Sequence, residues 1–345
     1  MKKLTNKIIT VPLADNLIQK IICLCTWVYI RFLKRGKYVS ERYRPVSPIK
    51  INKIFIDNSS DVAILMRGQI IKVDDFTKNS LKMYRLNYPK AEIFLSTWDY
   101  CVDEQFYLFA NEYNIKLVLT KFVKPKSGYK SDNLQIIGNV NGLKKIINNK
   151  IKYTFSTRTD QRFYSPNLLL YLKNVISDNP YQKSNNPKDH QINRLLAMSF
   201  DSFMFRLYGI EDMFLFGLTD DVYNYWNSDQ DQRIFDDKIK EKLSLKDLAK
   251  RRNCEVYFMT EFLKRNGHKL KWTLNDYFEV IRKRFIIIDS SSMDFFWPKY
   301  SFLEERHKDF KDIRFKEISY ADWLLIKNKQ LKPNEKILDL PWNNS

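Results

Sequence analysis

Two arginines and a carboxylate lie close together in the stretch Tyr153–Pro166, which reads YTFSTRTDQRFYSP. Its aromatic start, Tyr153–Phe155, predicts a buried strand, because aromatic side chains favour a pleated surface. The polar tip that follows holds Arg158, Asp160 and Arg162. Guanidiniums fork onto phosphate, and a carboxylate can bind a metal ion or a sugar hydroxyl. The tip is therefore either a phosphate or metal site, or an arginine–aspartate pair that only fixes a loop.

The elements that must position this tip begin at residue 61. Three short apolar runs, DVAILM, AEIFL and IKLVL, begin at Asp61, Ala91 and Ile115 and are typical of strands covered on both faces. Segments with helical spacing of apolar residues separate them, and a further helix is predicted over Ile136–Ile147. This β-α-β-α-β order predicts a parallel, doubly wound sheet, in which ligands bind at the carboxyl ends of the strands.

Two turns at those strand ends carry residues suited to ligand binding. Arg67-Gly68-Gln69 follows the first strand, and Gly68 permits a tight turn and close approach of a ligand. Ser96-Thr97-Trp98-Asp99 follows the second strand, and it is predicted to form a turn that caps the next helix.

A second group of acidic residues follows the long polar loop 177–193, which is predicted to be a substrate-facing flap or a mobile segment. Strands are predicted over Leu195–Phe200 and Met213–Phe216, with Glu211 and Asp212 between them. Thr219 is predicted to cap a helix whose first turn holds two more aspartates, a structural interpretation that needs no chemistry. The last third of the chain is predicted to be mainly helical, with one strand (FIIID, from Phe285) and with Trp323 in the core.

The composition indicates a globular protein whose 345 residues can bury a full core. Four cysteines without a disulfide framework are typical of a reducing cytoplasm. Three histidines far apart in the sequence argue against a histidine-rich zinc site.

The formal net charge of +19 is unevenly distributed. Residues 1–50 hold 11 Lys and Arg against 2 acidic residues, whereas the other 295 residues hold 48 against 38. A basic protein that binds nucleic acid is one interpretation. Because the excess is concentrated at the N-terminus and no helix-turn-helix, zinc-finger or RNA-recognition motif is present, no nucleic-acid partner is expected.

The N-terminal segment has an apolar centre, Ile21–Ile30, followed by Arg31, Lys34, Arg35 and Lys37. The centre is shorter than the roughly 20 apolar residues that a spanning helix needs, and no signal-peptide cleavage site follows it. Aromatic residues beside a basic cluster fit a helix in the interface of an anionic membrane. The alternative is an ordinary core-packing helix. The predicted organisation is a membrane-interfacial segment and linker (1–50), an α/β domain (51–230) and a mainly helical part (231–345).

Several stretches together resemble the WavE family of lipopolysaccharide-synthesis proteins. The resemblance covers roughly Asp61–Phe262 and rests on order and spacing. The stretches are DVAILMRGQI, YPKAEIFLSTWDY, LQIIGNVNGLK, TRTDQR and DMFLFGLTDDVYNYW, with weaker similarity at CEVYF and YADW.

This resemblance implies a GT-A-like fold and a glycosyltransferase that uses a nucleotide-diphospho-sugar. It also implies that Asp160 meets the donor phosphate through a divalent cation, Mn²⁺ or Mg²⁺, or meets the sugar directly, with Arg158 as an alternative carrier of the phosphate charge. The implied donor-binding residues are Arg67, Gly68, Ser96, Thr97, Trp98, Arg158, Thr159, Asp160 and Arg162.

Residues 51–230 are predicted to form the nucleotide-sugar-binding and catalytic domain, and residues 231–345 to complete the acceptor side. Glycosyl transfer has three chemical requirements. The leaving diphosphate must be stabilised, by Arg158, Arg162 or a cation, and a carboxylate such as Asp160 suits an oxocarbenium-like sugar. The acceptor hydroxyl needs a general base, for which Asp212 is the first candidate and Glu211 the second.

The expected acceptor is a lipid-linked or oligosaccharide precursor of lipopolysaccharide, capsule or another surface glycan. Residues 1–40 would hold the enzyme at the cytoplasmic face of the inner membrane. A non-catalytic membrane-peripheral protein is the remaining rival, since a nicotinamide enzyme would need a G-x-G-x-x-G turn that is missing after the first strand.

Overall fold

The computed structural model describes residues 44–48, 59–129, 131–183, 185–234, 243–299 and 312–342, and positions 20–22, 24, 25, 27, 28 and 31. The chain divides into two units, Met1–Arg44 and Pro45–Ser345. The larger unit contains the sheet and the helices around it.

Three strand–helix repeats and a fourth strand open the larger unit, which confirms the predicted order. Each predicted apolar run forms a strand, and all six residues of the first strand are buried. These elements are β1 (Val62–Arg67), α3 (Phe76–Asn87), β2 (Glu92–Trp98), α4 (Glu104–Glu112), β3 (Ile115–Thr120), α5 (Asp132–Asn148) and β4 (Tyr153–Arg158).

The second half of the unit has short strands between longer helices. In order they are β5 (Arg162–Phe163), α6 (Leu168–Ser177), β6 (Leu195–Met198), β7 (Leu215–Leu218), α7 (Thr219–Trp226), α8 (Leu245–Lys250), α9 (Cys254–Arg265), α10 (Leu274–Arg284), β8 (Phe285–Ile288), β9 (Phe295–Phe296) and α11 (Tyr320–Lys327).

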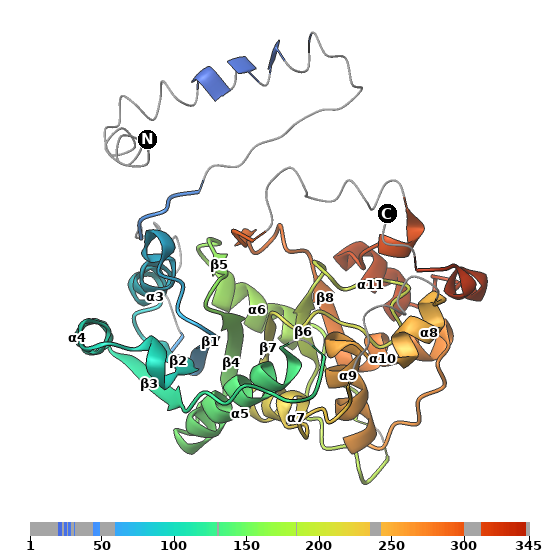
Figure 1. The fold of residues 1–345 in the computed structure, drawn as a ribbon. Helices are drawn as coiled ribbons and strands as arrows, with labels where there is room; N and C mark the ends of the chain where they lie inside the picture. The colour runs from blue at the N-terminus through green and yellow to red at the C-terminus, as the bar shows by residue number, and fades with distance from the viewer. Residues whose placement is uncertain are drawn as a thin grey trace. The chain divides into compact units, whose positions relative to one another are not determined.

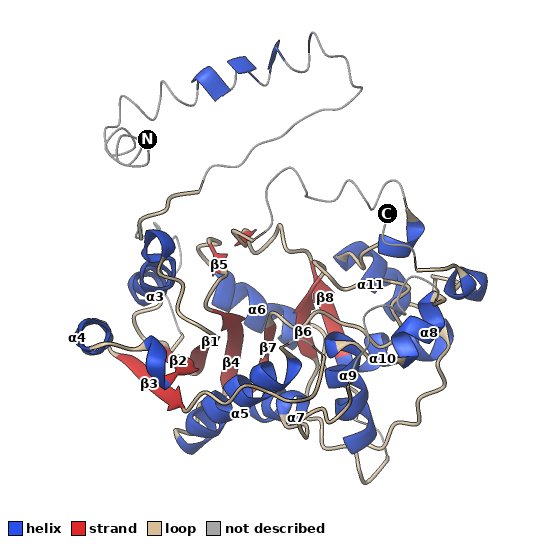
Figure 2. Ribbon diagram, viewed as in Figure 1, coloured by secondary structure: helices blue, strands red, loops and turns tan. Residues whose placement is uncertain are grey.

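Seven strands form one sheet in the order β3-β2-β1-β4-β7-β6-β8 (Figures 1 and 2). Four of the six pairings are parallel, and β7 runs antiparallel to both of its neighbours. This mostly parallel sheet flanked by helices is the predicted GT-A-like α/β fold. Because β7 runs in the opposite direction, the residues just before it lie at the edge where the parallel strands end.

Helices cover both faces of the sheet, as expected for a doubly wound fold. On one face α5 packs closely on β1, since a Cβ on Gly142 would lie 2.5 Å from the Leu65 Cδ1 atom, and α7 packs beside α5 (Figure 2). On the other face Tyr84 of α3 meets the Phe155 ring of β4.

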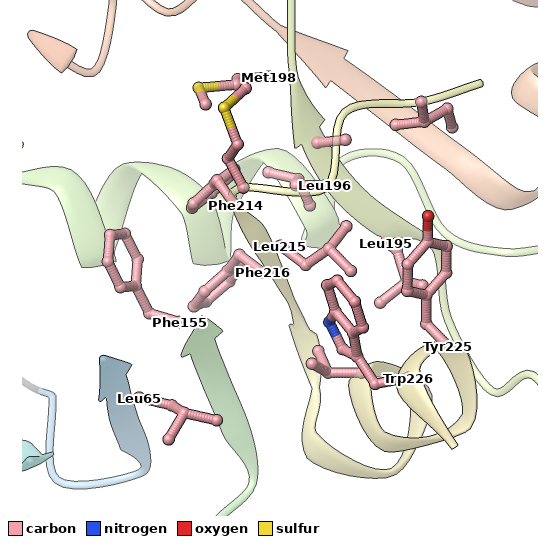
Figure 3. Close-up of a cluster of buried hydrophobic side chains, with 14 of the residues drawn as sticks. Leu65, Phe155, Leu195, Leu196, Met198, Phe214, Leu215, Phe216, Tyr225 and Trp226 are labelled. Atoms are coloured by element: carbon pink, nitrogen blue, oxygen red, sulfur yellow. The ribbon is translucent and has the colours of Figure 1, made fainter. Parts of the chain in front are cut away.

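Aromatic side chains join β4 to β7 in the core (Figure 3). The Phe155 and Phe214 rings lie 5.3 Å apart, and Tyr153 stacks on Phe216 at 5.7 Å. Because Phe214 follows Asp212 by two residues, this contact also holds the segment before β7 in place.

The last third of the chain contributes to the same sheet. The predicted FIIID strand is β8, which pairs with β6 in parallel, while α10 and α11 pack against it. Trp323 is fully buried, as predicted, and its indole N–H donates to the Phe285 carbonyl at 2.9 Å.

Two local predictions are wrong at helix starts. Ser96–Trp98 extends β2 instead of forming a cap, since these residues pair with β3, and Asp103 caps α4 by accepting from the Phe106 N–H. Thr219 lies inside α7, where its hydroxyl donates to the Ile151 carbonyl at 2.7 Å.

Asp221, in the first turn of α7, has a structural role as predicted, although the contact that gives it this role is not the predicted one. Its carboxylate accepts from the Ile192 and Asn193 N–H groups, each at 2.7 Å. It therefore fixes the end of the long polar loop, while Asp220 is exposed.

In the N-terminal unit the described positions between Lys20 and Arg31 are helical. Ile21, Leu24 and Trp27 are each at least half exposed. Among the described residues, none of the helices combines the length and the apolar character needed to cross a membrane.

Candidate functional site

A cavity of about 420 Å³ opens at the carboxyl edge of β1, β2 and β4. Its walls come from the last residues of β1, β2, β3 and β4, from the segments that follow these strands and from the first half of α5. Eight of the nine predicted donor-binding residues line it: Arg67, Gly68, Ser96, Thr97, Trp98, Arg158, Thr159 and Asp160. Parallel strands bring these segments together, although they are far apart in the sequence.

The loop after β1 is joined to the loop after β4. Gly68 has φ +121°, and a Cβ there would lie 2.9 Å from the Thr159 Oγ1 atom, so both the backbone and the space favour glycine. The Thr159 N–H donates to the Arg67 carbonyl at 3.0 Å, and its hydroxyl donates to the Gln69 carbonyl at 2.6 Å. One wall of the cavity is thereby rigid.

Arg67 is a buried arginine in this wall. Its Nη1 donates to the Gln135 Oε1 at 3.1 Å and its Nη2 to the Asp212 carbonyl. The guanidinium lies over the Trp226 ring at 4.8 Å, and its buried Nε has no hydrogen-bond partner among the described residues. Burial, followed by the positive charge of Arg158, lowers the pKa of Arg67 to about 10.

Arg158 and Asp160 form the forked ion pair that the sequence allowed. The Arg158 Nε and Nη2 each donate at 2.8 Å to a different oxygen of Asp160, and the Trp297 indole N–H donates to the Asp160 Oδ2 at 3.0 Å. Burial alone would raise the pKa of Asp160, but the Arg158 pair and Trp297 hold it below its usual value. Sequence reasoning missed Trp297, which lies beyond β9 and carries no local signal of this contact.

An aromatic group lies at the outer side of the cavity. The Phe122 ring meets Trp98 at 5.5 Å and Tyr100 at 5.6 Å, in edge-on contacts. Tyr100 is 59% exposed, so more than half of this residue is open to solvent. Deeper in the cavity, the Thr97 hydroxyl is buried, and it has no partner in the part of the chain that the structure describes.

Arg162, the ninth predicted residue, does not line the cavity. It is 1% exposed, and it donates to Ser80 Oγ at 2.9 Å and to the Val46 and Phe76 carbonyls at 2.8 and 3.1 Å. Its guanidinium binds backbone in the interior, where no phosphate can reach it. The prediction that Arg162 carries donor charge therefore has no support in the geometry.

Glu211 is fully buried, and its carboxylate accepts hydrogen bonds from backbone N–H groups. Its two oxygens accept from the N–H groups of Met198, Met213 and Phe214 at 3.1, 2.6 and 2.9 Å. Burial raises its pKa to about 8. These contacts shape the turn before β7, and they leave Asp212 as the better placed of the two candidate bases.

Asp212 lies behind the cavity. Its Oδ2 accepts from the Gln135 Nε2 at 2.6 Å, and Gln135 itself lines the cavity. The Gln135 amide thus bridges Arg67 and Asp212. On its other side Asp212 meets Cys254 and Glu255, with ligand atoms all within 4.8 Å of one another.

A second cavity, of about 310 Å³, lies beyond this acidic group. Asp201, Arg206 and several aromatic side chains line it, among them Phe203, Phe205 and Trp342. Arg206 pairs with Asp201 at 3.3 Å and approaches Glu255 at 3.9 Å. Burial raises the pKa of Asp201 to about 7. Sequence reasoning missed Asp201, which could have been found as the first acidic residue after the β6 strand.

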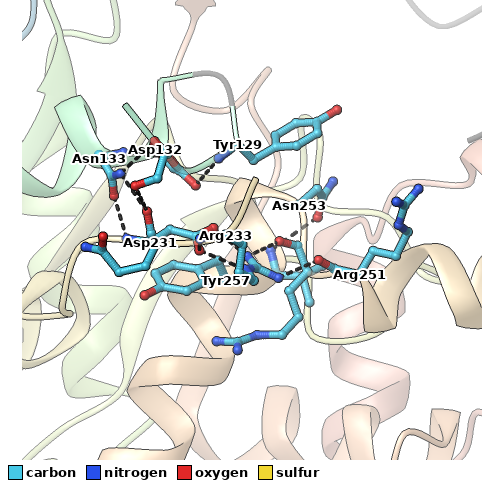
Figure 4. A network of polar contacts seen from close by, with 12 residues as sticks. Tyr129, Asp132, Asn133, Asp231, Arg233, Arg251, Asn253 and Tyr257 are labelled. Carbon is cyan, nitrogen blue, oxygen red and sulfur yellow. Dashed lines mark hydrogen bonds and ion pairs between the residues drawn. The ribbon is translucent and has the colours of Figure 1, made fainter. Parts of the chain in front are cut away.

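The N-terminal end of α5 lies next to both cavities. Tyr129 lines the second cavity, whereas Ser131 and Leu134 line the first. A polar network holds this end against the segment before α8 (Figure 4): the Asp231 N–H donates to the Asn133 Oδ1 at 2.6 Å, and Asp231 pairs with Arg233 at 2.6 Å. The start of α5 is therefore held in place by hydrogen bonds to the segment after α7.

Two places could be considered for the implied divalent cation. Asp160 already accepts three hydrogen bonds and lies against a guanidinium, which opposes a second positive charge. Within the part of the chain that the structure describes, one group offers three metal-ligand side chains, Asp212, Cys254 and Glu255. This group does not line the first cavity, and Mn²⁺ and Mg²⁺ prefer oxygen over thiol ligands. Neither place fits a cation bound to a diphosphate in the first cavity.

No protein-family model and no curated protein matches this chain, so membership of the WavE family stays a prediction. Three solved structures show remote similarity. Mannose-1-phosphate geranyltransferase from Thermus thermophilus is 10% identical, with a TM-score of 0.25 over 40% of this chain and 41% of that one. A protein assigned as a nucleotide-diphospho-sugar transferase from Desulfovibrio desulfuricans is 8% identical, with a TM-score of 0.36 over 78% and 95%.

The third is a single-site mutant of UDP-glucose pyrophosphorylase from Leishmania major, which is 11% identical with a TM-score of 0.26 over 51% of this chain and 45% of that one. This chain therefore spans less than half of the length of the first and third proteins. At such identities, the function of this chain has to be inferred from its own site.

Proposed function

We propose that the chain is a glycosyltransferase that moves a sugar from a nucleotide-diphospho-sugar to a saccharide acceptor. The observation that carries this proposal is the first cavity, where the loops after β1, β2 and β4 bring eight predicted donor-binding residues together. Its size suits a small ligand. Arg67 and Arg158 provide positive charge for phosphate, and Tyr100 offers an exposed ring for a nucleotide base.

In the proposed reaction, the acceptor hydroxyl oxygen bonds to the anomeric carbon of the donor sugar, and the bond from that carbon to the diphosphate breaks. The hydroxyl proton passes to the carboxylate of Asp212. The support for this role is what surrounds the Asp212 carboxylate. It accepts from Gln135, which lines the first cavity, and it lies beside Glu255, which Arg206 of the second cavity approaches at 3.9 Å.

The acceptor is proposed to bind in the second cavity. Aromatic walls with a few polar side chains are typical of small-molecule sites, and here the polar groups are Asp201 and Arg206. Such walls suit the apolar faces of a sugar ring, while the polar groups suit its hydroxyls. We propose a lipid-linked or oligosaccharide precursor of lipopolysaccharide, capsule or another surface glycan, on the basis of the stretches that resemble the WavE family.

A thermal-shift screen of the full chain tests the donor. UDP-, GDP-, CMP- and TDP-sugars are compared, each with Mn²⁺, with Mg²⁺ and with EDTA. The matching nucleotide is expected to raise the melting temperature, because a ligand at 100 times its Kd stabilises the native state by about 2.7 kcal/mol. If none of the nucleotide-sugars shifts the melting temperature under any condition, the proposal fails.

The N-terminal segment is proposed to hold the enzyme at the cytoplasmic face of the inner membrane. The support is its basic cluster, next to a helix whose Ile21, Leu24 and Trp27 side chains are exposed. An acceptor that is linked to lipid would then be presented at the surface where the enzyme is held.

Replacing Lys34, Arg35 and Lys37 together with glutamine is expected to weaken binding to anionic vesicles by on the order of 100-fold, because each basic residue near the surface contributes about 1 kcal/mol. Vesicle sedimentation at low and high salt measures the effect. The matched control replaces Lys121, Lys124 and Lys126, three exposed lysines of the loop after β3. Equal binding by the two triple variants, or full binding after deletion of residues 1–40, would contradict the proposal.

A further inference from the structure

We propose that a pair of guanidiniums, Arg67 and Arg158, binds the diphosphate of the donor without a divalent cation, and that Asp160 orients Arg158 instead of ligating a metal. This inference rests on the proposed function, because it assigns the recognition of the donor within the same cavity. Four observations lead to it.

The first observation is the placement of two like charges side by side. Arg67 ends β1 and Arg158 ends β4, and the two residues are direct partners in the parallel register. Both line the first cavity. Burial and then the positive charge of Arg158 lower the pKa of Arg67, while the carboxylates of Asp212, Glu211 and Asp160 act in the opposite direction. Such a pair destabilises the empty site, and an anion between the two guanidiniums relieves the repulsion.

The second observation is the incomplete hydrogen bonding of the cavity wall. The Arg67 Nε and the Thr97 hydroxyl are both buried without a partner among the described residues, and both residues line the cavity while being less than 5% exposed. An unsatisfied buried donor costs about 1–3 kcal/mol. A diphosphate is rich in acceptor oxygens and matches this deficit, whereas a hydrated metal ion would present further donors.

The third observation is the state of Asp160. Both of its oxygens accept from the Arg158 fork, and one also accepts from Trp297. A cation at this carboxylate would have to displace the fork and lie against the guanidinium. Asp160 supplies the one carboxylate among the described residues that line the cavity. A cation bound there would find no second negatively charged oxygen ligand among these residues.

The fourth observation is the rigidity of the Arg158 guanidinium. It is held in its plane by the Asp160 fork, and it lies over the Trp297 ring at 5.0 Å. A planar guanidinium held in this way is preorganised to bind phosphate oxygens, which is how arginine differs from lysine. Asp160 is therefore a positioning residue in this proposal.

Isothermal titration with inorganic pyrophosphate in EDTA tests the inference on the full chain. Pyrophosphate is expected to bind wild type under these conditions. Arg158→Gln is expected to weaken that binding by about 10- to 100-fold, since hydrogen bonds to charged groups contribute about 1.5–3 kcal/mol. Arg158→Lys should recover only part of the loss, because an ammonium cannot fork.

Arg282→Gln is the matched control. Arg282 is also a largely buried arginine forked onto a carboxylate, that of Glu279 in α10, and it lies outside the cavity. Its replacement should leave pyrophosphate affinity unchanged. Urea unfolding of each variant shows whether the fold is retained.

Asp160→Asn separates the two roles of this carboxylate. If Asp160 orients Arg158, the variant binds pyrophosphate more weakly in EDTA, and neither Mn²⁺ nor Mg²⁺ changes the ratio of its affinity to that of wild type. If Asp160 is a metal ligand, wild type binds a nucleoside diphosphate only with a divalent cation. The Asp160→Asn variant then no longer gains affinity when the cation is added. The second result overturns the inference.

The outcome also separates this inference from the proposed function. Nucleotide-sugar binding that requires a cation would overturn the guanidinium pair and leave the transferase proposal standing. Pyrophosphate binding in EDTA without a response to any nucleotide-sugar would support the anion site and count against the transferase.

Discussion

Asp212→Asn is expected to lower the turnover of sugar transfer by about 10²- to 10⁴-fold, which is the contribution that a positioned general base makes to catalysis. The asparagine keeps the shape of the side chain but cannot take the acceptor proton. Because one negative charge next to Arg67 is removed, the affinity for the nucleotide-sugar is expected not to fall. The loss should therefore appear in kcat, with donor binding retained.

Once the thermal-shift screen has identified the donor, two measurements test this expectation. The rate of transfer to a soluble saccharide acceptor gives kcat, and a binding assay with the nucleotide-sugar gives the donor affinity. Asp220→Asn is the matched control, because Asp220 is exposed in the first turn of α7 and should leave the rate unchanged. Full activity of Asp212→Asn would exclude Asp212 as the base, and attention would then move to Asp201, the acidic residue that lines the second cavity.

Phe155→Ala is expected to lower the free energy of unfolding by about 3–5 kcal/mol, the usual cost of truncating a buried phenylalanine. Phe155 is 1% exposed, and its ring meets Tyr84, Phe163 and Phe214 at 6.3, 5.2 and 5.3 Å. The cavity left behind would loosen the contact between β4 and the segment before β7. A fall in transfer activity should accompany the loss of stability.

Urea denaturation measures this change, with Leu108→Ala as the control. Leu108 is 64% exposed in α4, so its truncation should change stability by no more than about 0.5 kcal/mol. If the two variants lost equal stability, the aromatic contact between β4 and the segment before β7 would not be the main support of this part of the core.

Much of the fold could be predicted because the relevant signals are local. Continuous apolar runs indicated β1, β2 and β3, and a strand–helix alternation implies a parallel sheet whose carboxyl ends share one edge. Together with the resemblance to the WavE family, this rule led to the prediction that Gly68, Thr97 and Asp160 lie around one ligand. The cavity confirms their proximity, although their roles stay predictions.

The partners of polar side chains could not be predicted, because they depend on tertiary contacts that leave no local pattern. Arg162 and Arg158 look equivalent in TRTDQR, yet the first binds backbone carbonyls in the interior and the second lines the cavity. Glu211 and Asp212 are adjacent, but their partners differ. Glu211 accepts from the Met198 N–H of β6, whereas Asp212 accepts from Gln135, which lines the cavity. Trp297 follows Asp160 by 137 residues, and nothing in the sequence links the two.

The helix starts show a different reason for error. Ser96 and Thr97 are good capping residues, but Ser96 donates to the Gly138 carbonyl of α5 at 2.7 Å while its backbone continues β2. Sheet pairing with β3 outweighed the local capping preference. Asp103, which has the same capping chemistry a few residues later, caps α4 instead.

The bond between Trp297 and Asp160 has a consequence for the order in which the protein is made. At about 5–20 residues per second, the 137 residues that separate them take roughly 7–27 s to synthesise. During that interval the loops after β1, β2 and β4 have left the ribosome, but the indole that supports the Arg158–Asp160 pair does not yet exist. The first cavity thus gains this hydrogen bond only after Trp297 has been made, although most of its wall is translated earlier.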